Sequence, residues 1–183
     1  MSMALKVHRW TRADLASIAD DGNRYEVLDG KLLVTPQARL PHQWIGVQLI
    51  TRLDPYVREH GLGIVVGPGA VIFGPNELQP DVAVVPVLPE RMPEKWDDAP
   101  LAILVIEVLS TTTRRRDLGM KREAYQRIGI HTYWAIDRFQ RRVMSWTPHS
   151  DEATIHLDEL RWQPHSDVDP LVIPLPDILP PRP

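Results

Sequence analysis

The sequence predicts an α/β (α+β) fold, in which helices flank a mixed central β-sheet. The length of 183 residues suits one domain, and 43% hydrophobic with 25% charged residues is an ordinary globular composition. Segments with strand-like and helix-like apolar spacing alternate along the chain, as in sheets covered by helices. We expect a single domain over 1–183, with a core at about 10–148 and a proline-rich extension, 149–183, packed on that core.

The first predicted elements are a short helix and a hairpin. Thr11 is a suitable N-cap for the helix. Residues 24–28 and 31–34 are short apolar runs on either side of Asp-Gly, a dipeptide that favours tight β-turns. These runs therefore predict two antiparallel strands.

A long helix is expected next. Apolar residues recur at near-helical spacing after Pro41, which suits a first helical turn, and the pattern stops at Gly61 or Gly63. Beyond it the chain becomes strand-like. Short strands are expected at 64–66, 70–73 and 82–85.

The second half of the chain contains the most apolar segment. A proline-rich loop at 86–100 precedes 101–109, whose continuous apolar run predicts a central strand that is covered on both faces. A helix is expected at about 114–128, where Gly129 ends the pattern. The remaining elements are two strands that form a hairpin, 132–137 and 141–146, and an extended tail from Pro170.

Composition excludes several classes of protein. The chain has no cysteine, which excludes disulfides, thiolate zinc sites, iron–sulfur clusters and a cysteine nucleophile. It has no run of about 20 apolar residues, so no membrane span is predicted. We therefore expect a soluble, cytoplasmic protein.

Charge is distributed unevenly. The net charge is −3, yet the segment 110–145 holds nine Arg or Lys against three Asp or Glu, so it carries +6 and the rest carries −9. Such a segment can bind a polyanion, or it can be a solvated helix face followed by a charged hairpin. The charge pattern alone leaves both interpretations open.

Two carboxylates fall on neighbouring predicted strands. Glu107 lies near the end of the most apolar strand, where a charge is costly unless it is paired or bound to a cation. Asp81 begins the preceding strand. If the strands are adjacent, the two side chains converge, and hard oxygen ligands suit Mg²⁺ or Mn²⁺. The alternative is that Asp81 caps a turn and Glu107 pairs with an arginine.

A lysine occupies the apolar face of the helix that follows. Leu118, Lys121, Tyr125 and Ile128 share one face, so Lys121 is a cation on a packed stripe. It either meets a carboxylate or phosphate, or extends along the packed edge to solvent. Two acids and a lysine around a divalent cation form an arrangement that cleaves phosphodiesters.

Several segments together carry a resemblance to a known family. They are Pro80-Asp81, Ile-Glu-Val-Leu-Ser at 106–110, Arg-Arg-Arg-Asp at 114–117 with Lys-Arg-Glu-Ala-Tyr at 121–125, Tyr-Trp-Ala-Ile-Asp at 133–137, and Arg-Tyr-Glu-Val-Leu-Asp-Gly at 24–30. In these segments the chain resembles the Uma-type family of restriction-endonuclease-like proteins, a bacterial group of the PD-(D/E)xK nuclease superfamily. The resemblance covers roughly residues 10–140.

The resemblance implies a restriction-endonuclease-like fold and assigns roles to individual residues. Asp81 and Glu107 are the implied metal ligands, with the backbone carbonyl of Val108 as a third, and Glu26 is an acidic residue near the metal. The chain departs from the superfamily pattern at Leu109, where the motif lysine is usual. Lys121 resembles a substitute that comes from the next helix.

Further residues are assigned to the surroundings of the site. His42, at the start of a helix, either reaches Glu26 or is a satisfied structural histidine. Tyr125 is expected beside the site. The arginines expected to contact nucleic-acid phosphates are Arg114, Arg115, Arg116 and Arg122.

The function hypothesis is therefore a metal-dependent endonuclease that hydrolyses DNA phosphodiester bonds, with Mg²⁺ or Mn²⁺ as cofactor. A homodimer is plausible because cutting a duplex takes two cleavages. The alternative is the same fold acting as a module that binds nucleic acid or protein without cleavage. A third hypothesis is a protein-interaction domain that uses the proline-rich loop and tail.

Overall fold

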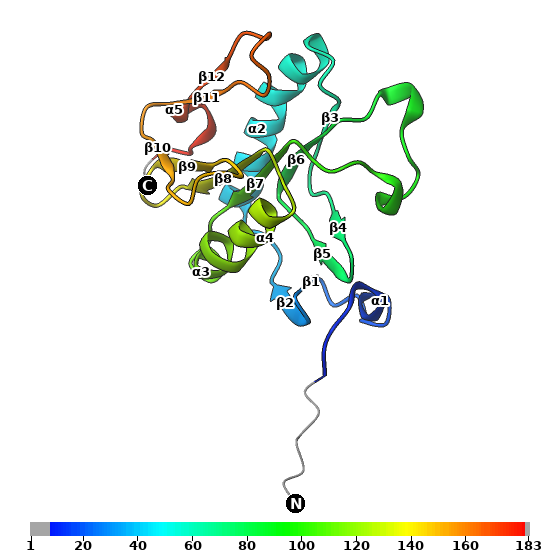
Figure 1. Cartoon of the computed structure of the whole chain (residues 1–183). Helices are drawn as coiled ribbons and strands as arrows, with labels where there is room; N and C mark the ends of the chain where they lie inside the picture. Colours follow the sequence, from blue (N-terminus) through cyan, green and yellow to red (C-terminus); the bar gives the residue numbers. More distant parts are fainter. Residues whose placement is uncertain (1–7, 182–183) are drawn as a thin grey trace, which may run out of the picture.

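A computed structural model describes residues 8–181 (Figure 1). Its first elements are α1 (Arg12–Leu15), β1 (Arg24–Leu28), β2 (Lys31–Thr35), α2 (Leu40–Glu59), β3 (Ile64–Val66), β4 (Val71–Phe73), β5 (Asn76–Leu78) and β6 (Val82–Val85). The elements that follow are η1 (Pro89–Arg91), η2 (Trp96–Asp98), β7 (Leu104–Val108), α3 (Arg114–Arg116), η3 (Asp117–Lys121), α4 (Arg122–Arg127), β8 (Thr132–Asp137), β9 (Arg142–Trp146), β10 (Thr154–His156), β11 (Glu159–Trp162), β12 (Leu171–Pro174) and α5 (Leu175–Ile178).

A six-stranded mixed sheet forms the centre of the fold, in the order β10-β9-β8-β7-β6-β3. Only β7 and β8 pair in parallel, and the other neighbours are antiparallel. Helix α2 covers one face, and the helical segment 114–127 covers the other (Figure 1). The predicted α/β fold with a mixed central sheet is confirmed, and every residue of β7 is buried as expected for a central strand.

A second sheet, in the order β2-β1-β5-β4, lies beside the first. The predicted hairpin β1–β2 is present, with Glu26 paired to Leu33. The structure assigns the neighbouring strands β3 and β4 to different sheets, and it adds β5, which the sequence analysis does not predict. A strand of three residues, two of them polar, carries too little alternation to be recognised.

The helical segment 114–127 contains one wider turn. Residues Asp117–Lys121 form a π-helical turn, in which the Arg122 N–H reaches back to the Asp117 carbonyl. Such turns insert one extra residue into an α-helix and are frequent at functional sites. Here the turn carries both Asp117 and Lys121 toward the sheet, and both are buried.

The C-terminal part differs from the predicted extended tail. Strand β12 is extended and pairs with β11, but the chain then forms one helical turn, α5. Leu175 and Ile178 of this turn are buried against the core on the α2 side. Pro176 does not prevent the turn, because proline is tolerated in the first turn of a helix. The boundary between core and extension stays a prediction.

Within residues 8–181, none of the helices combines the length and the hydrophobicity that crossing a bilayer requires.

Candidate active site

The two strand-borne carboxylates lie opposite each other, as predicted. Strands β6 and β7 are antiparallel neighbours with Val82 paired to Ile106, which places Asp81 across from Glu107. The Asp81 N–H donates to the Ile106 carbonyl at 3.1 Å. The Val108 N–H donates to Oδ2 of Asp81 at 2.8 Å. The sheet itself therefore orients the Asp81 carboxylate beside the end of β7.

Lys121 joins this pair to a third carboxylate. Its Nζ lies 2.7 Å from Oε1 of Glu26 and forms a closer ion pair with Oε1 of Glu107. The lysine and Glu26 are fully buried, so the lysine does not extend to solvent. The Tyr125 hydroxyl donates to Oε1 of Glu107 at 3.0 Å, and the Gln79 N–H donates to Oε1 of Glu26 at 2.8 Å.

Asp81 also has two cationic neighbours at the partly exposed side of the site. Nη1 of Arg24 donates to Oδ1 at 2.9 Å, and Nε2 of His42 lies 2.9 Å from Oδ2. The side chains of Arg24, His42 and Asp81 are 21%, 18% and 9% exposed, whereas the glutamates lie deeper. The histidine therefore contacts Asp81, not Glu26 as the first alternative expected.

Two residues of the site are missing from the sequence prediction. Arg24 is one, and its contact with Asp81 joins residues 57 positions apart, for which no local signal exists. Asp117 is the other: it is 2% exposed and lies one helical turn before Lys121. Asp117 lies four residues before Lys121, a spacing that places two residues on the same side of a helix, and this spacing could have identified Asp117 from the sequence. The Tyr133 hydroxyl holds this turn by donating to the Asp117 carbonyl.

The surroundings of Asp81 and Glu26 keep both carboxyl groups ionised. Burial alone would raise the pKa of Asp81, but His42, Arg24 and the Val108 N–H outweigh burial and lower the pKa to about 2. Burial likewise opposes ionisation of Glu26, yet Lys121, Arg24 and the Gln79 N–H lower its pKa below the usual range. Both side chains are therefore anionic at neutral pH.

For Glu107 and Asp117 the surroundings instead raise the pKa and favour the protonated carboxyl group. Burial, together with the charges of Asp117, Asp81 and Glu26, raises the pKa of Glu107 to about 8, against the attraction of Lys121. Burial also raises the pKa of Asp117. The lysine stays protonated, because the surrounding carboxylates raise its pKa although burial opposes this. The site therefore gathers four carboxyl groups around one lysine, and the pKa values of Glu107 and Asp117 rise in response.

The predicted phosphate-contacting arginines have different surroundings. Arg116 donates to Oγ1 of Thr35 at 2.6 Å and lies 3.7 Å from Glu26, so it faces the site. Arg114 pairs with Asp137. Arg122 lies over the Trp146 ring, 5.9 Å from its centroid. Only Arg115 of the four is exposed. Their role toward nucleic acid stays a prediction.

Hard-cation binding is compatible with this donor set. Asp81 and Glu107 present carboxylate oxygens at one point of the sheet, and Oε2 of Glu26 is buried without a hydrogen bond. Carboxylate oxygens gathered at one place suit Mg²⁺ or Mn²⁺. Within residues 8–181, however, no three His, Asp or Glu side chains are gathered closely enough to hold a metal by themselves. A cation would therefore need backbone or water oxygens as additional ligands.

Leu109 stands at the usual lysine position of the superfamily pattern. It is 1% exposed and packs in the apolar core between the sheet and the helical segment 114–127. No cation could occupy that position without losing this packing. Lys121 instead brings its amine to the two glutamates from the helix.

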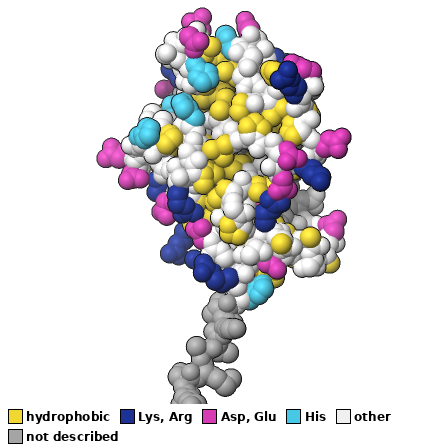
Figure 2. All heavy atoms as spheres, turned by 45° about the vertical axis from the view of Figure 1, so that its right-hand side comes forward, with side chains coloured by type: hydrophobic (Ala, Val, Ile, Leu, Met, Phe, Trp, Pro, Cys, Tyr) yellow, Lys and Arg dark blue, Asp and Glu magenta, His cyan; other side chains and the backbone are white. Residues whose placement is uncertain are grey.

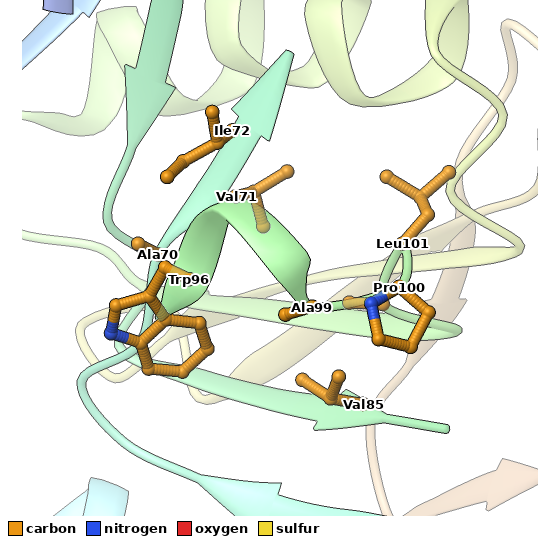
Figure 3. A pocket seen from close by; sticks show the side chains of 9 residues that line it. Ala70, Val71, Ile72, Val85, Trp96, Ala99, Pro100 and Leu101 are labelled. Carbon is orange, nitrogen blue, oxygen red and sulfur yellow. The ribbon is translucent and has the colours of Figure 1, made fainter. Parts of the chain in front are cut away.

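Apolar cavities lie away from the carboxylates. One of about 70 Å³ is lined by Val71, Val85, Trp96 and Leu101 (Figure 3). Val85 ends β6, whereas Asp81 precedes the start of the same strand. Figure 2 shows apolar side chains gathered on the face that it turns forward, with charged groups around them. The residues that line the cavity are separate from the candidate site.

Comparisons with known proteins agree with this architecture. The family described as "Uma2: Putative restriction endonuclease" matches residues 8–180. A solved structure, "a putative nuclease belonging to DUF820 from Anabaena variabilis ATCC 29413", superposes with a TM-score of 0.69 at 16% sequence identity and covers 92% of this chain and 96% of that chain. At this identity the likeness shows the shared fold. No curated protein matches the sequence. The match over residues 8–180 shows that the chain belongs to the Uma2 family.

Proposed function

We propose that this protein is a metal-dependent endonuclease that hydrolyses DNA phosphodiester bonds. The observation that carries the proposal is the convergence of Asp81, Glu107 and a fully buried Lys121 at the end of the central strand. Family membership supports it, because the family's description reads "Putative restriction endonuclease". The structural neighbour, described as "a putative nuclease", shares the fold.

Asp81 and Glu107 are the residues that would hold Mg²⁺ or Mn²⁺, with the Val108 carbonyl as a further ligand. A bound cation supplies polarisation of a phosphate oxygen and a lowered pKa for an attacking water. Asp81 suits this role because it remains ionised, with a pKa of about 2. Glu107 suits it because a cation would relieve the crowding of negative charge that raises its pKa to about 8.

Lys121 would act as a hydrogen-bond donor, not as a base. Its amine stays protonated because Glu107, Glu26 and Asp117 raise its pKa against the effect of burial. A protonated amine cannot take a proton from water, but it can stabilise negative charge that develops on the phosphate. Glu26 and Tyr125 position this group, since the first holds the amine and the second holds the Glu107 carboxylate.

The substrate in this proposal is DNA. We also propose that the protein acts as a homodimer. A duplex has two strands, so a complete cut requires two hydrolytic events. Two copies of the chain would supply one site for each strand.

A second candidate function follows from the contacts that Asp81 already makes. Arg24 and His42 neutralise it, and Lys121 lies between Glu26 and Glu107. A site whose charges are balanced internally can persist in a module that binds nucleic acid or protein without cleaving it. A DNA-cleavage assay distinguishes this binding module from the proposed endonuclease.

The decisive experiment is cleavage of supercoiled plasmid with Mg²⁺ or Mn²⁺, in which wild type is compared with Glu107→Gln. We expect nicking by wild type and a loss of at least a hundredfold in the variant, the scale of a lost catalytic group. Glu123→Gln is the matched control, because it is the same substitution at a glutamate that lies on α4 and is 64% exposed. Equal cleavage by wild type and Glu107→Gln contradicts the site, and no cleavage by any form favours the binding module.

A further inference from the structure

The turn between β8 and β9 has features of a nucleic-acid contact. It comprises residues 138–141, which follow Asp137 at the end of β8 and precede Arg142 at the start of β9. We propose that this turn binds an unpaired stretch of the DNA strand, with Phe139 stacking on a base and Arg138 beside it. The proposal rests on the proposed function for its choice of DNA as partner.

The turn lies at the same end of the sheet as the candidate site. Strands β7 and β8 are parallel, and Glu107 pairs with Ala135, four residues before Phe139. With about 3.3 Å per strand residue and about 4.8 Å between strands, Phe139 lies at most about 14 Å from Glu107, because the chain turns after Asp137. That span equals a few nucleotides of a strand. One strand could therefore contact both places.

Phe139 is exposed in a way that suits stacking. It is 53% exposed, and the Arg138 guanidinium lies 4.1 Å from the ring centroid. The arginine lies over one face of the ring in a cation–π contact, and about half of the phenylalanine remains exposed to a flat partner. Binding of single strands combines stacking on aromatic side chains with cationic contacts to the backbone.

The positive charge of this region exceeds what its acid compensates. Asp137 is fully buried under the turn, where Arg114 pairs with it and Arg142 lies 3.9 Å away. Arg138 and Arg141 add two further cations. The region is therefore basic on a chain with a net charge of −3, which favours a negatively charged partner such as a polyanion over a neutral or basic one.

The turn is also held in one conformation. Oδ1 of Asp137 accepts from the N–H groups of Phe139 at 3.2 Å and Gln140 at 3.1 Å. Arg141 has a φ of 51°, a conformation that favours glycine, and its Nη1 donates to the Pro180 carbonyl at 2.7 Å. A fixed turn presents Phe139 without an ordering cost on binding.

Stacking on Phe139 selects for unpaired bases. A base within a duplex has both faces covered by its neighbours, and opening a step to insert a side chain has a free-energy cost. A single strand or an overhang offers a free base without that cost. The turn therefore favours DNA with an unpaired segment beside the position of cleavage.

The test is DNA binding without cleavage, measured by fluorescence anisotropy in EDTA. A labelled single-stranded oligonucleotide and a blunt duplex of the same sequence are the probes. We expect tighter binding of the single strand by wild type and a five- to hundredfold loss in Phe139→Ala, roughly the effect of one lost stacking contact. Phe139→Trp should bind like wild type, and Phe139→Leu should bind like the alanine variant.

Two controls accompany these variants. Leu157→Ala removes an apolar side chain that is 64% exposed, and Arg161→Gln removes an exposed arginine on β11. Both should leave binding unchanged. Arg138→Gln should make the plot of log affinity against log salt less steep by about 0.7, the contribution of one phosphate contact on a single strand.

Each outcome decides the proposal. Unchanged single-strand binding in Phe139→Ala, equal losses for single strand and duplex, or no DNA binding at all would overturn it. Plasmid cleavage is tested separately. If DNA binding depends on Phe139 but the plasmid is not nicked, this inference stands and the proposed nuclease function is contradicted. If the plasmid is nicked but DNA binding does not depend on Phe139, the nuclease function stands and this inference is contradicted.

Discussion

At the residue scale, the candidate site is a buried network of opposite charges. Glu26 and Lys121 are fully buried, and Glu107 is 1% exposed. Taking such groups out of water costs several kcal/mol for each ion, which only close pairing and hydrogen bonds offset. The Tyr125 hydroxyl and the Gln79 N–H supply some of those bonds. An apolar core of similar volume would be at least as stable, so the network indicates a function.

The first prediction concerns the central cation of this network. Lys121→Met removes the cation that lies closest to both Glu26 and Glu107, which stay buried with only weaker partners. We expect a loss of about 3–5 kcal/mol in the free energy of unfolding, as when one partner of a buried pair is removed. Urea denaturation measures this loss.

Two further variants make that prediction specific. Lys31→Met replaces an exposed lysine on β2 and should change stability by less than about 0.5 kcal/mol. Glu26→Gln combined with Lys121→Met should recover part of the loss, because one uncompensated charge is removed with its partner. If Lys121→Met unfolds at the same urea concentration as wild type, the buried ion pairs do not contribute to folding.

At the element scale, the helical segment 114–127 shows what sequence can and cannot predict. Its position and the burial of Lys121 and Tyr125 follow from apolar spacing, and the structure has both. The π-helical turn changes only which carbonyl accepts a hydrogen bond, which no residue type marks. Asp117 is buried by this turn, whereas Leu118 is only partly buried.

In the sheet, too, some features can be predicted from the sequence and others cannot. The apolar runs predict the strands that carry Asp81 and Glu107, whereas the sequence analysis treats the adjacency of these strands only as a condition, which the structure meets. The short strand β5 and the contact of Arg24 with Asp81 depend on pairing between distant segments, so a local pattern cannot reveal them. The metal, the DNA contact and the catalytic roles stay predictions.

The edge strand β10 carries a prediction about pH. Nε2 of His156 lies 2.9 Å from Oγ of Ser145 on β9. Burial lowers the pKa of His156 below its usual value of 6.5, and a weaker contact with the Glu159 backbone opposes this. The unfolded chain therefore takes up this proton at a higher pH than the folded chain, so stability falls as pH drops below about 6.5.

Proton NMR of the ring measures this directly, with an expected pKa below 6.5. The midpoint of thermal unfolding of His156→Gln should depend less on pH between 7.5 and 5 than that of wild type. His165 is the matched control, because it is an exposed histidine near the C-terminus. A pKa for His156 at or above 6.5 contradicts the prediction.

At the scale of the whole molecule, the two ends of the central sheet are chemically different. One end holds Asp81, the end of β7 and the basic turn between β8 and β9. The other holds the proline-rich loop 86–100 and the apolar cavity (Figure 3). The two ends therefore differ in charge: the turn at one end is basic, whereas the loop at the other carries four acidic and two basic side chains beside the cavity.

Metal binding should be visible in the stability of the whole chain. A ligand that binds only the folded state stabilises it by RT ln(1 + [L]/Kd), about 2.7 kcal/mol at a hundredfold excess over Kd. If Asp81 and Glu107 hold a divalent cation, Mg²⁺ or Mn²⁺ should raise the midpoint of thermal unfolding of wild type. Asp81→Asn and Glu107→Gln should lose that increase, because each lacks an anionic ligand.

Arg24 makes the metal prediction sharper. Its guanidinium holds Oδ1 of Asp81, so a cation at that carboxylate competes with an internal ion pair. Arg24→Gln should therefore lower the stability of the metal-free protein while it increases the gain on adding Mn²⁺. Arg58→Gln, which removes an exposed arginine near the end of α2, should leave both quantities unchanged. An increase in thermal stability that is the same in wild type, Asp81→Asn and Glu107→Gln would mean that the cation binds elsewhere, and the catalytic assignment would have to move with it.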